Sequence, residues 1–260
     1  MGCLRCAAAA FVLIVAVCMP RNTDAAELKI LSSGALKLAL VQLVPEFQKS
    51  SGNAVTIEYH VAAVIANRIQ KGESADVAIV SRSQLQTLET QGKIIQGSRV
   101  NIASVGIGVA VRKGAPKPEI SSVAAFKRAL LSARSIGYND PASGSASGTY
   151  IASLLDRLGI AQDLNAKIKL VRPAGDELEK NFEGLAKGEI EMYITPISEI
   201  VISPGVELVG PLPGEIQNVT SLAAGAVTTT KAPETARAFI NFISSPGAAH
   251  LLKANGFEPG

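Results

Sequence analysis

Short apolar runs of strand type alternate with segments of helical period along most of this chain. In the first part, strand-like runs at residues 28–31 and 77–80 each precede a helical segment, at residues 36–48 and 85–91. A second strand-like run at residues 55–59 leads into a helical segment at 64–71. Such alternation is typical of α/β proteins, and it predicts a mainly parallel sheet covered by helices.

A second alternating set lies in the middle of the chain, between Pro- and Gly-rich breaks at residues 114–118 and 210–214. The elements expected in it are strands at 135–138, 167–171 and 191–194 and helices at 147–158 and 177–187. Because clusters of Pro and Gly interrupt regular structure, each break marks a boundary. We therefore expect two α/β lobes, the first built from residues 27–108 and 215–260 and the second from residues 109–214.

The first 26 residues have the pattern of a secretory signal peptide. Arg5 supplies a positive start, residues 7–17 are apolar, and Ala25 and Ala26 form a small-residue cleavage region. The apolar run is too short to span a bilayer. We expect cleavage near Ala25 or Ala26 and a periplasmic mature protein.

All three cysteines, Cys3, Cys6 and Cys18, lie within this signal. The mature chain is thus expected to have no disulfide, thiolate metal site or cysteine nucleophile. Lipid anchoring through Cys18 is not expected, because Val17 is too bulky for the position before a lipidated cysteine. The formal net charge is only +3, and no run of Lys or Arg exists, so nucleic acid is not an expected partner.

Two Ser- and Gly-rich stretches, residues 32–35 and 143–149, lie about 110 residues apart, each between a strand-like and a helix-like segment. The start of a helix presents free backbone N–H groups and a positive dipole end, which together favour an anion. Ligands of parallel α/β sheets bind beyond the carboxyl ends of the strands. Since each lobe contributes one stretch, we expect the ligand cleft to lie between the lobes.

Several segments resemble one known family. They are residues 28–36, 75–79, 155–159 and 239–257, together with Asp140-Pro141 before the second Ser/Gly stretch. Over nearly the whole mature chain, the sequence resembles the periplasmic molybdate-binding proteins, which are substrate-binding components of ABC importers with the type II periplasmic binding-protein fold. The resemblance implies a monomer that captures a small anion by hinge closure near residues 105–112 and 210–220 and then docks on an inner-membrane ABC permease. It implies no cofactor, no metal and no catalytic residue.

The resemblance is incomplete at the ligand-binding positions. Members of the family hold a tetrahedral oxyanion with a serine hydroxyl after each of the first two strands, backbone N–H groups from the second lobe and a tyrosine hydroxyl. The corresponding positions here hold Ala35, Ala62 or Ala63, and Thr195. Each missing charge-assisted hydrogen bond removes about 1.5–3 kcal/mol of binding free energy. Two ligand classes therefore stay open, a molybdate-like oxyanion and a small organic acid such as a di- or tricarboxylate.

Charged residues at other strand ends favour the organic acid. His60, Arg82 and Arg172 each follow a strand-like run, and an arginine guanidinium binds a carboxylate through two parallel hydrogen bonds. Ser147 is expected to cap the helix after the second Ser/Gly stretch. The residues expected to contact the ligand are Ser32, Ser33, His60, Ala63, Arg82, Ser145, Ser147, Thr149 and Thr195.

Two alternatives keep the same sequence features. A secreted α/β hydrolase would need serine at the centre of Gly144-Ser145-Ala146-Ser147-Gly148, where this chain has alanine, and its two histidines, His60 and His250, have no spacing typical of a triad or a zinc site. We therefore expect no enzymatic activity. A binding protein that presents its ligand to a membrane sensor, rather than to a transporter, has no distinguishing feature in the sequence.

Overall fold

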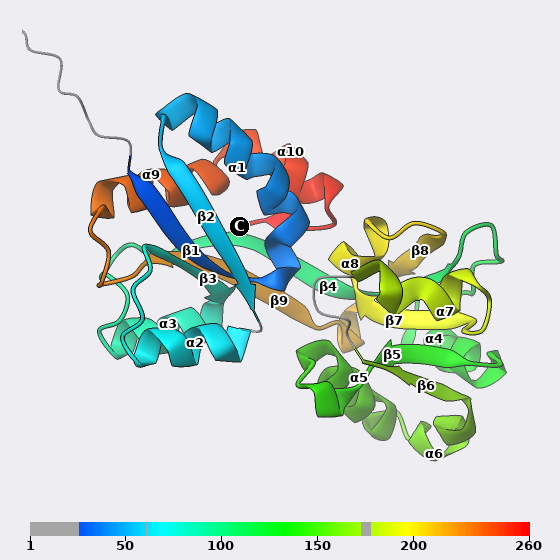
Figure 1. Ribbon diagram of the computed structural model, residues 1–260. Helices are drawn as coiled ribbons and strands as arrows, with labels where there is room; N and C mark the ends of the chain where they lie inside the picture. Colours follow the sequence, from blue (N-terminus) through cyan, green and yellow to red (C-terminus); the bar gives the residue numbers. More distant parts are fainter. Residues whose placement is uncertain (1–25, 61, 173–177) are drawn as a thin grey trace, which may run out of the picture.

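The structure is a computed structural model that describes residues 26–60, 62–172 and 178–260. Residues 1–25 of the predicted signal peptide, the predicted strand end at Pro173 and the first residue of the helix expected at 177–187 lie outside these ranges. The described strands form one sheet in the order β2-β1-β3-β9-β4-β7-β5-β6, and β10 and β8 also pair with β4 (Figure 1). The strands are β1 (Glu27–Ser33), β2 (Ala54–His60), β3 (Val77–Ser81), β4 (Val100–Arg112), β5 (Ile136–Asn139), β6 (Ile168–Val171), β7 (Met192–Pro196), β8 (Val206–Pro211), β9 (Val219–Ala226) and β10 (Glu258–Pro259).

Helices cover both faces of the sheet, which confirms the predicted α/β fold class. β1 pairs in parallel with β2 and β3, and β5 pairs in parallel with β6 and β7, whereas β4 and β9 run antiparallel to their neighbours. The helices are α1 (Lys37–Ser51), α2 (Ala62–Gln70), α3 (Arg82–Thr90), α4 (Val123–Ser132), α5 (Ala146–Arg157), α6 (Ala161–Leu164), α7 (Glu183–Ala186), α8 (Ile197–Val201), α9 (Pro233–Ile243) and α10 (Pro246–Ala254).

The apolar run of β3 shows why this strand is buried on both faces. Successive side chains of a strand point to opposite sides. Val77 and Ile79 pack in the core under α1, α9 and α10, whereas Ala78 and Val80 pack in the core over α2 and α3. Aromatic rings join helices from the two ends of the chain in the first of these cores, where the rings of Phe47 and Phe239 lie 5.1 Å apart.

A separate pair of cores forms around β5, β7 and the second half of β4, on the other side of Figure 1. Along β4 the change occurs between Val105, which packs in the first-lobe core, and Ile107, which packs in the second-lobe core. We call the two halves the first and second lobe in this sense. The exact domain boundaries stay a prediction, since one sheet runs through both lobes.

The chain crosses between the lobes on β4 and again just before β9, and one side chain holds the two crossings together. The Gln217 Oε1 atom accepts hydrogen bonds from the backbone N–H of Ile107 at 2.8 Å and of Asn218 at 2.9 Å. Its Nε2 atom donates to the carbonyl oxygens of Ile107 at 3.0 Å and Leu212 at 3.3 Å. Gln217 thus occupies the place of a strand partner beside β4.

The lobes also touch through α8. Ile197 at the start of this helix packs against the core of the first lobe. A Cβ atom added to Gly256, just after α10, would lie 2.9 Å from the Val201 side chain and 3.0 Å from the Ser198 Cα atom. Because Gly256 also has a φ of +79°, glycine is required there for two reasons.

The sequence patterns missed some elements of the second lobe. No strand was expected between the breaks at residues 204–205 and 210–214. The structure has the short strand β8 there, paired with β4, where a terminal proline is tolerated. In place of the long helix expected at 177–187, the described residues form a 3₁₀ turn at Leu178–Phe182 and the single turn of α7. Gly188, with a φ of +80°, ends that turn. No helix in the described part of the chain is long and apolar enough to cross a membrane.

Candidate ligand-binding site

The carboxyl ends of the parallel strands of the two lobes face each other across the crossing strands. β3 ends at Ser81, which lies opposite Leu222 of β9, and β7 ends at Pro196, which lies opposite Ile107 of β4. β9 and β4 are themselves paired between these two points (Figure 1). The two sets of strand ends therefore approach the crossing from opposite sides. This is the edge at which α/β proteins bind ligands.

In the first lobe this edge carries a buried hydroxyl with no partner. Ser33 ends β1, and only 8% of the residue is exposed. Its Oγ atom forms no hydrogen bond with any part of the chain that the structure describes. The neighbouring Ser32 is fully buried, and its hydroxyl donates to the Ser33 carbonyl oxygen at 3.1 Å. A buried hydroxyl without a partner destabilises a fold by about 1–3 kcal/mol, so Ser33 favours an incoming acceptor.

Three other predicted contact residues lie at the same edge of the first lobe. His60 ends β2, Ala63 lies exposed in the first turn of α2, and Arg82 begins α3 after the N-cap residue Ser81. Arg82 is exposed and forms no ion pair within the described ranges. The structure brings these residues to the expected edge, and their contact with a ligand stays a prediction.

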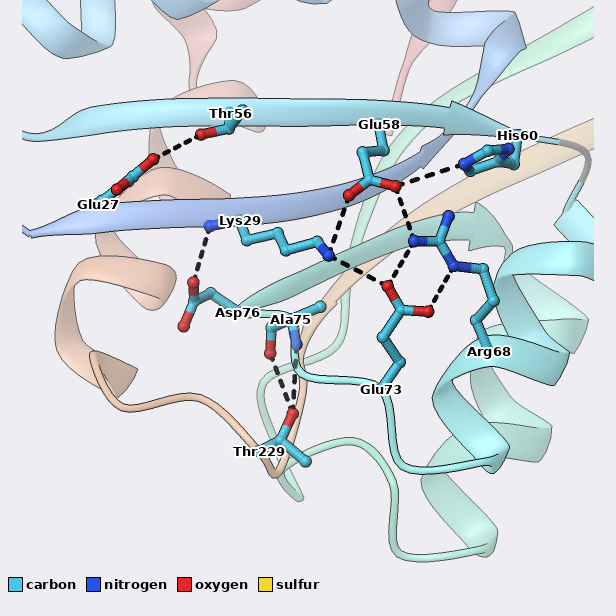
Figure 2. A network of polar contacts seen from close by, with 10 residues as sticks. All are labelled: Glu27, Lys29, Thr56, Glu58, His60, Arg68, Glu73, Ala75, Asp76 and Thr229. Carbon is cyan, nitrogen blue, oxygen red and sulfur yellow. Dashed lines mark hydrogen bonds and ion pairs between the residues drawn. The ribbon is translucent and has the colours of Figure 1, made fainter.

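His60 belongs to a network of charges from β1, β2, α2 and the loop before β3 (Figure 2). Its Nε2 atom lies 3.5 Å from the Glu58 carboxylate. Glu58 also pairs with Lys29 at 2.9 Å and with Arg68 at 2.7 Å, and Arg68 and Lys29 both reach Glu73. Hydrogen bonds from Arg68 first, and from Lys29, lower the pKa values of Glu58 and Glu73 to about 2. The network fixes α2, whose first turn borders the site.

Replacing Arg68 with glutamine is expected to lower the free energy of unfolding by about 1 kcal/mol at pH 7, because the pairs are partly solvated. The carboxylates of Glu58 and Glu73 have depressed folded-state pKa values, so their contribution is complete above about 4.5 and is lost as the pH falls towards 2. Urea unfolding at several pH values should show the difference from the native protein shrinking over that range. Arg134→Gln, which removes one exposed pair with Glu191, is the control and should cost less. A difference that stays constant down to pH 3 would contradict this account.

In the second lobe, the start of α5 carries the hydroxyls of the second Ser/Gly stretch. The structure corrects one expectation, because the N-cap is Ser145 and not Ser147. A short 3₁₀ turn after Asp140 ends at Gly144, whose φ is +80°, so the helix begins earlier than the pattern indicates. The Ser145 Oγ atom accepts from the Gly148 N–H at 3.1 Å and lies 3.0 Å from the Ser147 Oγ atom.

Thr149 is less available than expected. Its hydroxyl donates to the Ser145 carbonyl oxygen at 2.9 Å, one turn back along α5. The same helix approaches β5 very closely. A Cβ atom added to Gly148 would lie 2.0 Å from the carbonyl oxygen of Asn139, the last residue of β5. Gly148 therefore sets how near the hydroxyls of α5 come to the strand end.

Side chains that the sequence analysis did not select complete this part of the site. The Tyr193 hydroxyl donates to the Asn139 Oδ1 atom at 2.7 Å, and the Asn139 Nδ2 atom lies 3.4 Å from the Ser147 Oγ atom. The predicted contact residue Thr195 is fully buried, and its hydroxyl donates to the Glu199 carboxylate at 2.6 Å. In this structure the Thr195 hydroxyl therefore bonds to Glu199. Tyr193 lies two residues before Thr195 on the same face of β7, and this alternation in the sequence could have identified Tyr193 as a member of the site.

Glu199 is the unexpected member of the cluster. Burial raises the pKa of its carboxyl, and hydrogen bonds from Thr195 and Asn139 oppose that shift. Burial and the Glu199 charge in turn raise the pKa of the Tyr193 hydroxyl. At the edge of the cluster, the exposed Arg172 pairs with Asp140 at 3.4 Å.

These contacts allow anion binding better than hydrolysis. Neither histidine is hydrogen-bonded to a serine hydroxyl in the described ranges, since His60 pairs with Glu58 and His250 with the Gly247 carbonyl oxygen. No group of three or more His, Cys, Asp or Glu residues in those ranges is placed to hold a metal ion. What the site offers is hydroxyls and a helix start at facing strand ends.

A two-lobed α/β fold with hydroxyls at facing strand ends defines a ligand-binding protein of the periplasmic type. The sequence matches the family described as bacterial extracellular solute-binding protein over residues 28–258. The chain belongs to this family.

Individual relatives carry different names. The chain is 32% identical over 244 residues to a protein of Pseudomonas sp named aconitate isomerase, covering 89% of this chain and 87% of the relative. It is 23% identical over 236 residues to the molybdate-binding protein ModA of Escherichia coli K12, covering 90% of each. The predicted resemblance to molybdate-binding proteins is thereby confirmed.

Solved structures agree on the fold. The substrate-binding domain of a putative molybdenum ABC transporter from Clostridium difficile superposes with a TM-score of 0.74 at 15% identity, covering 91% of this chain and all of that one. An identity this low is evidence for the fold alone.

Proposed function

We propose that this protein binds a small organic acid with several carboxylates, of the size and charge of aconitate, between its two lobes. The observation that carries the proposal is the buried, unpartnered hydroxyl of Ser33 at the strand edge of the first lobe. The hydroxyls of Ser145 and Ser147 lie at the strand edge of the second lobe. Donors on both sides suit a ligand with negative charge at both ends. The relative named for aconitate supports the choice of acid.

The first lobe also suits a larger ligand than a tetrahedral oxyanion. Ala35 and Ala63 are exposed, and their small side chains leave room for a larger ligand. The exposed Arg82 is a cation at the same edge and suits a carboxylate.

The proposal includes the biological setting. The protein is exported by its signal peptide, works as a periplasmic monomer and closes its lobes on the acid, and the closed form then docks on an inner-membrane ABC permease. Closure needs no chemistry, because the ligand only has to favour the closed state over the open one. The name of the Pseudomonas relative adds isomerisation of the acid as a second candidate function.

A thermal-shift screen of the mature chain, residues 27–260, tests the proposal. The ligands are citrate and cis- and trans-aconitate, against molybdate, tungstate, sulfate and phosphate. A ligand at a hundred times its dissociation constant stabilises the folded state by about 2.7 kcal/mol, which raises the melting temperature by several degrees. We expect a shift with the tricarboxylates. A shift with molybdate and tungstate alone would overturn the proposal.

Replacing Ser33 with alanine is expected to have opposite effects on stability and on affinity. The free protein should be as stable as the native one or slightly more stable, because a buried hydroxyl without a partner is removed. The affinity for the acid should fall about 10- to 100-fold, the loss of one charge-assisted hydrogen bond. Calorimetric titration and melting curves of the same sample measure both. Ser50→Ala, remote from the strand ends, should leave the affinity unchanged; equal affinity in Ser33→Ala would remove Ser33 from the site.

A further inference from the structure

Glu199 is out of place in a site that only holds an anion. Its carboxylate lies among the hydroxyl and amide groups of Thr195, Asn139 and Tyr193, at the ends of β5 and β7. Through Asn139 it connects to Ser147 at the start of α5. A carboxylate in this position adds no donor and repels the ligand when it is ionised. A group that weakens binding but is held by two hydrogen bonds indicates a use other than binding.

We propose that Glu199 exchanges a proton with the carbon skeleton of the bound acid, so that the protein moves the double bond of an unsaturated tricarboxylic acid as well as holding it. This inference rests on the proposed function, because it needs such an acid in the site. It assigns the proton-transfer group of the second candidate function, an activity that the binding-protein fold does not require.

The step needs no oxidant, reductant or second substrate. The Glu199 carboxylate takes a proton from the methylene carbon next to the double bond, and the electron pair of the broken C–H bond becomes the new π bond. The former π pair moves to the far carbon and forms a C–H bond there with a proton that Glu199 returns after exchange with solvent. Glu199 ends as the carboxylate, and the double bond has shifted by one carbon. The bond from the methylene carbon is still single before the transfer, so rotation about it in the bound acid decides whether the new double bond is cis or trans.

The surroundings of Glu199 suit this role. Burial raises the pKa of its carboxyl above the ordinary value, which makes the carboxylate a stronger base than a solvated one. The hydrogen bond from Thr195, together with that from Asn139, fixes the carboxylate in place. Negative charge that spreads onto the ligand carboxylates during the transfer is favoured by the start of α5, where Ser145 and Ser147 lie.

Proton NMR of the mature protein with trans-aconitate in D₂O tests the proposal. We expect the native protein to produce cis-aconitate and to exchange the methylene and vinylic hydrogens for deuterium, faster than a sample without protein. Glu199→Gln should lower both rates by at least about 100-fold, because the amide cannot take a proton at neutral pH. Its amide oxygen still accepts from Thr195, so calorimetric titration should show that the variant binds the acid.

Controls separate this inference from the proposed function. Glu207→Gln changes a carboxylate on β8 that pairs with Lys117 and should leave both rates unchanged. Should the glutamine variant fail to fold, Glu199→Asp withdraws the carboxylate by one methylene and should slow exchange at least about 10-fold. Native protein that binds aconitate without isomerisation or exchange would overturn the inference and leave the proposed function standing. Exchange that persists in Glu199→Gln would also overturn it, and native protein that does not bind the acid would overturn both.

Discussion

Replacing Gly148 with alanine is expected to destabilise the protein by about 3 kcal/mol and to abolish ligand binding. The new Cβ atom would lie 2.0 Å from the Asn139 carbonyl oxygen and 2.9 Å from its carbonyl carbon. Both are backbone atoms of a buried strand, so neither can rotate away. The start of α5 must move outwards, which separates the Ser145 and Ser147 hydroxyls from the end of β5.

Urea unfolding measures the loss of stability, and the thermal-shift screen measures the loss of binding. The matched control is Gly247→Ala, in the first turn of α10, where the added Cβ atom meets only the Ser245 side chain at an ordinary 3.5 Å. Alanine has the higher helix propensity, so this control should be neutral or slightly stabilising. Similar stability of Gly148→Ala and Gly247→Ala would show that α5 does not pack as closely against β5 as the structure has it.

Replacing Gln217 with alanine is expected to lower the free energy of unfolding by about 3 kcal/mol, since several partly buried backbone groups lose their partner at once. The groups that lose this partner are the N–H of Ile107, the N–H of Asn218 and the carbonyl of Leu212, while the Ile107 carbonyl keeps the Leu212 N–H at 3.0 Å. All lie where the chain crosses between the lobes. We therefore also expect a looser connection between the lobes and a lower affinity for the ligand.

Amide hydrogen exchange at Ile107 gives a local readout of this loss, and urea unfolding gives the global one. Gln70→Ala is the control, because its exposed amide makes a single hydrogen bond with Gln91 at 3.0 Å. That variant should change stability by no more than about 0.5 kcal/mol. Unchanged exchange at Ile107 in Gln217→Ala would show that the side chain does not protect the crossing.

The sequence predicted the architecture because the apolar pattern has few solutions. A run of four apolar residues at the start of β3, followed by a helical segment, favours a strand with a core on each face, and the structure buries all four. The Ser/Gly stretches predicted the facing strand ends for a similar reason, since a helix that follows a parallel strand starts at its carboxyl end. Ser33 and Ser145 lie at those ends as expected.

What the sequence could not predict depends on pairs of residues that only the fold brings together. Glu199 is unremarkable in the sequence, and its importance comes from Thr195 beneath it and from Asn139 on another strand. Gln217 gains its role from Ile107, on the other crossing. The correction at Ser145 has a local cause, because the left-handed Gly144 decides where the helix begins. Ser147 and Ser145 are equally good caps by residue type.

The pairing of β3 with β9 has a consequence for the order in which the chain acquires structure during synthesis. β3 has β1 on one side, but its other neighbour is made only near the end of the chain. Until β9 is synthesised, that edge of the first lobe exposes unpaired backbone groups and apolar side chains, and such an edge can associate with other chains. The strands that line the second-lobe cores fall within one continuous stretch from β4 to β8. The second lobe can therefore form its cores while the first is still waiting for β9, α9 and α10.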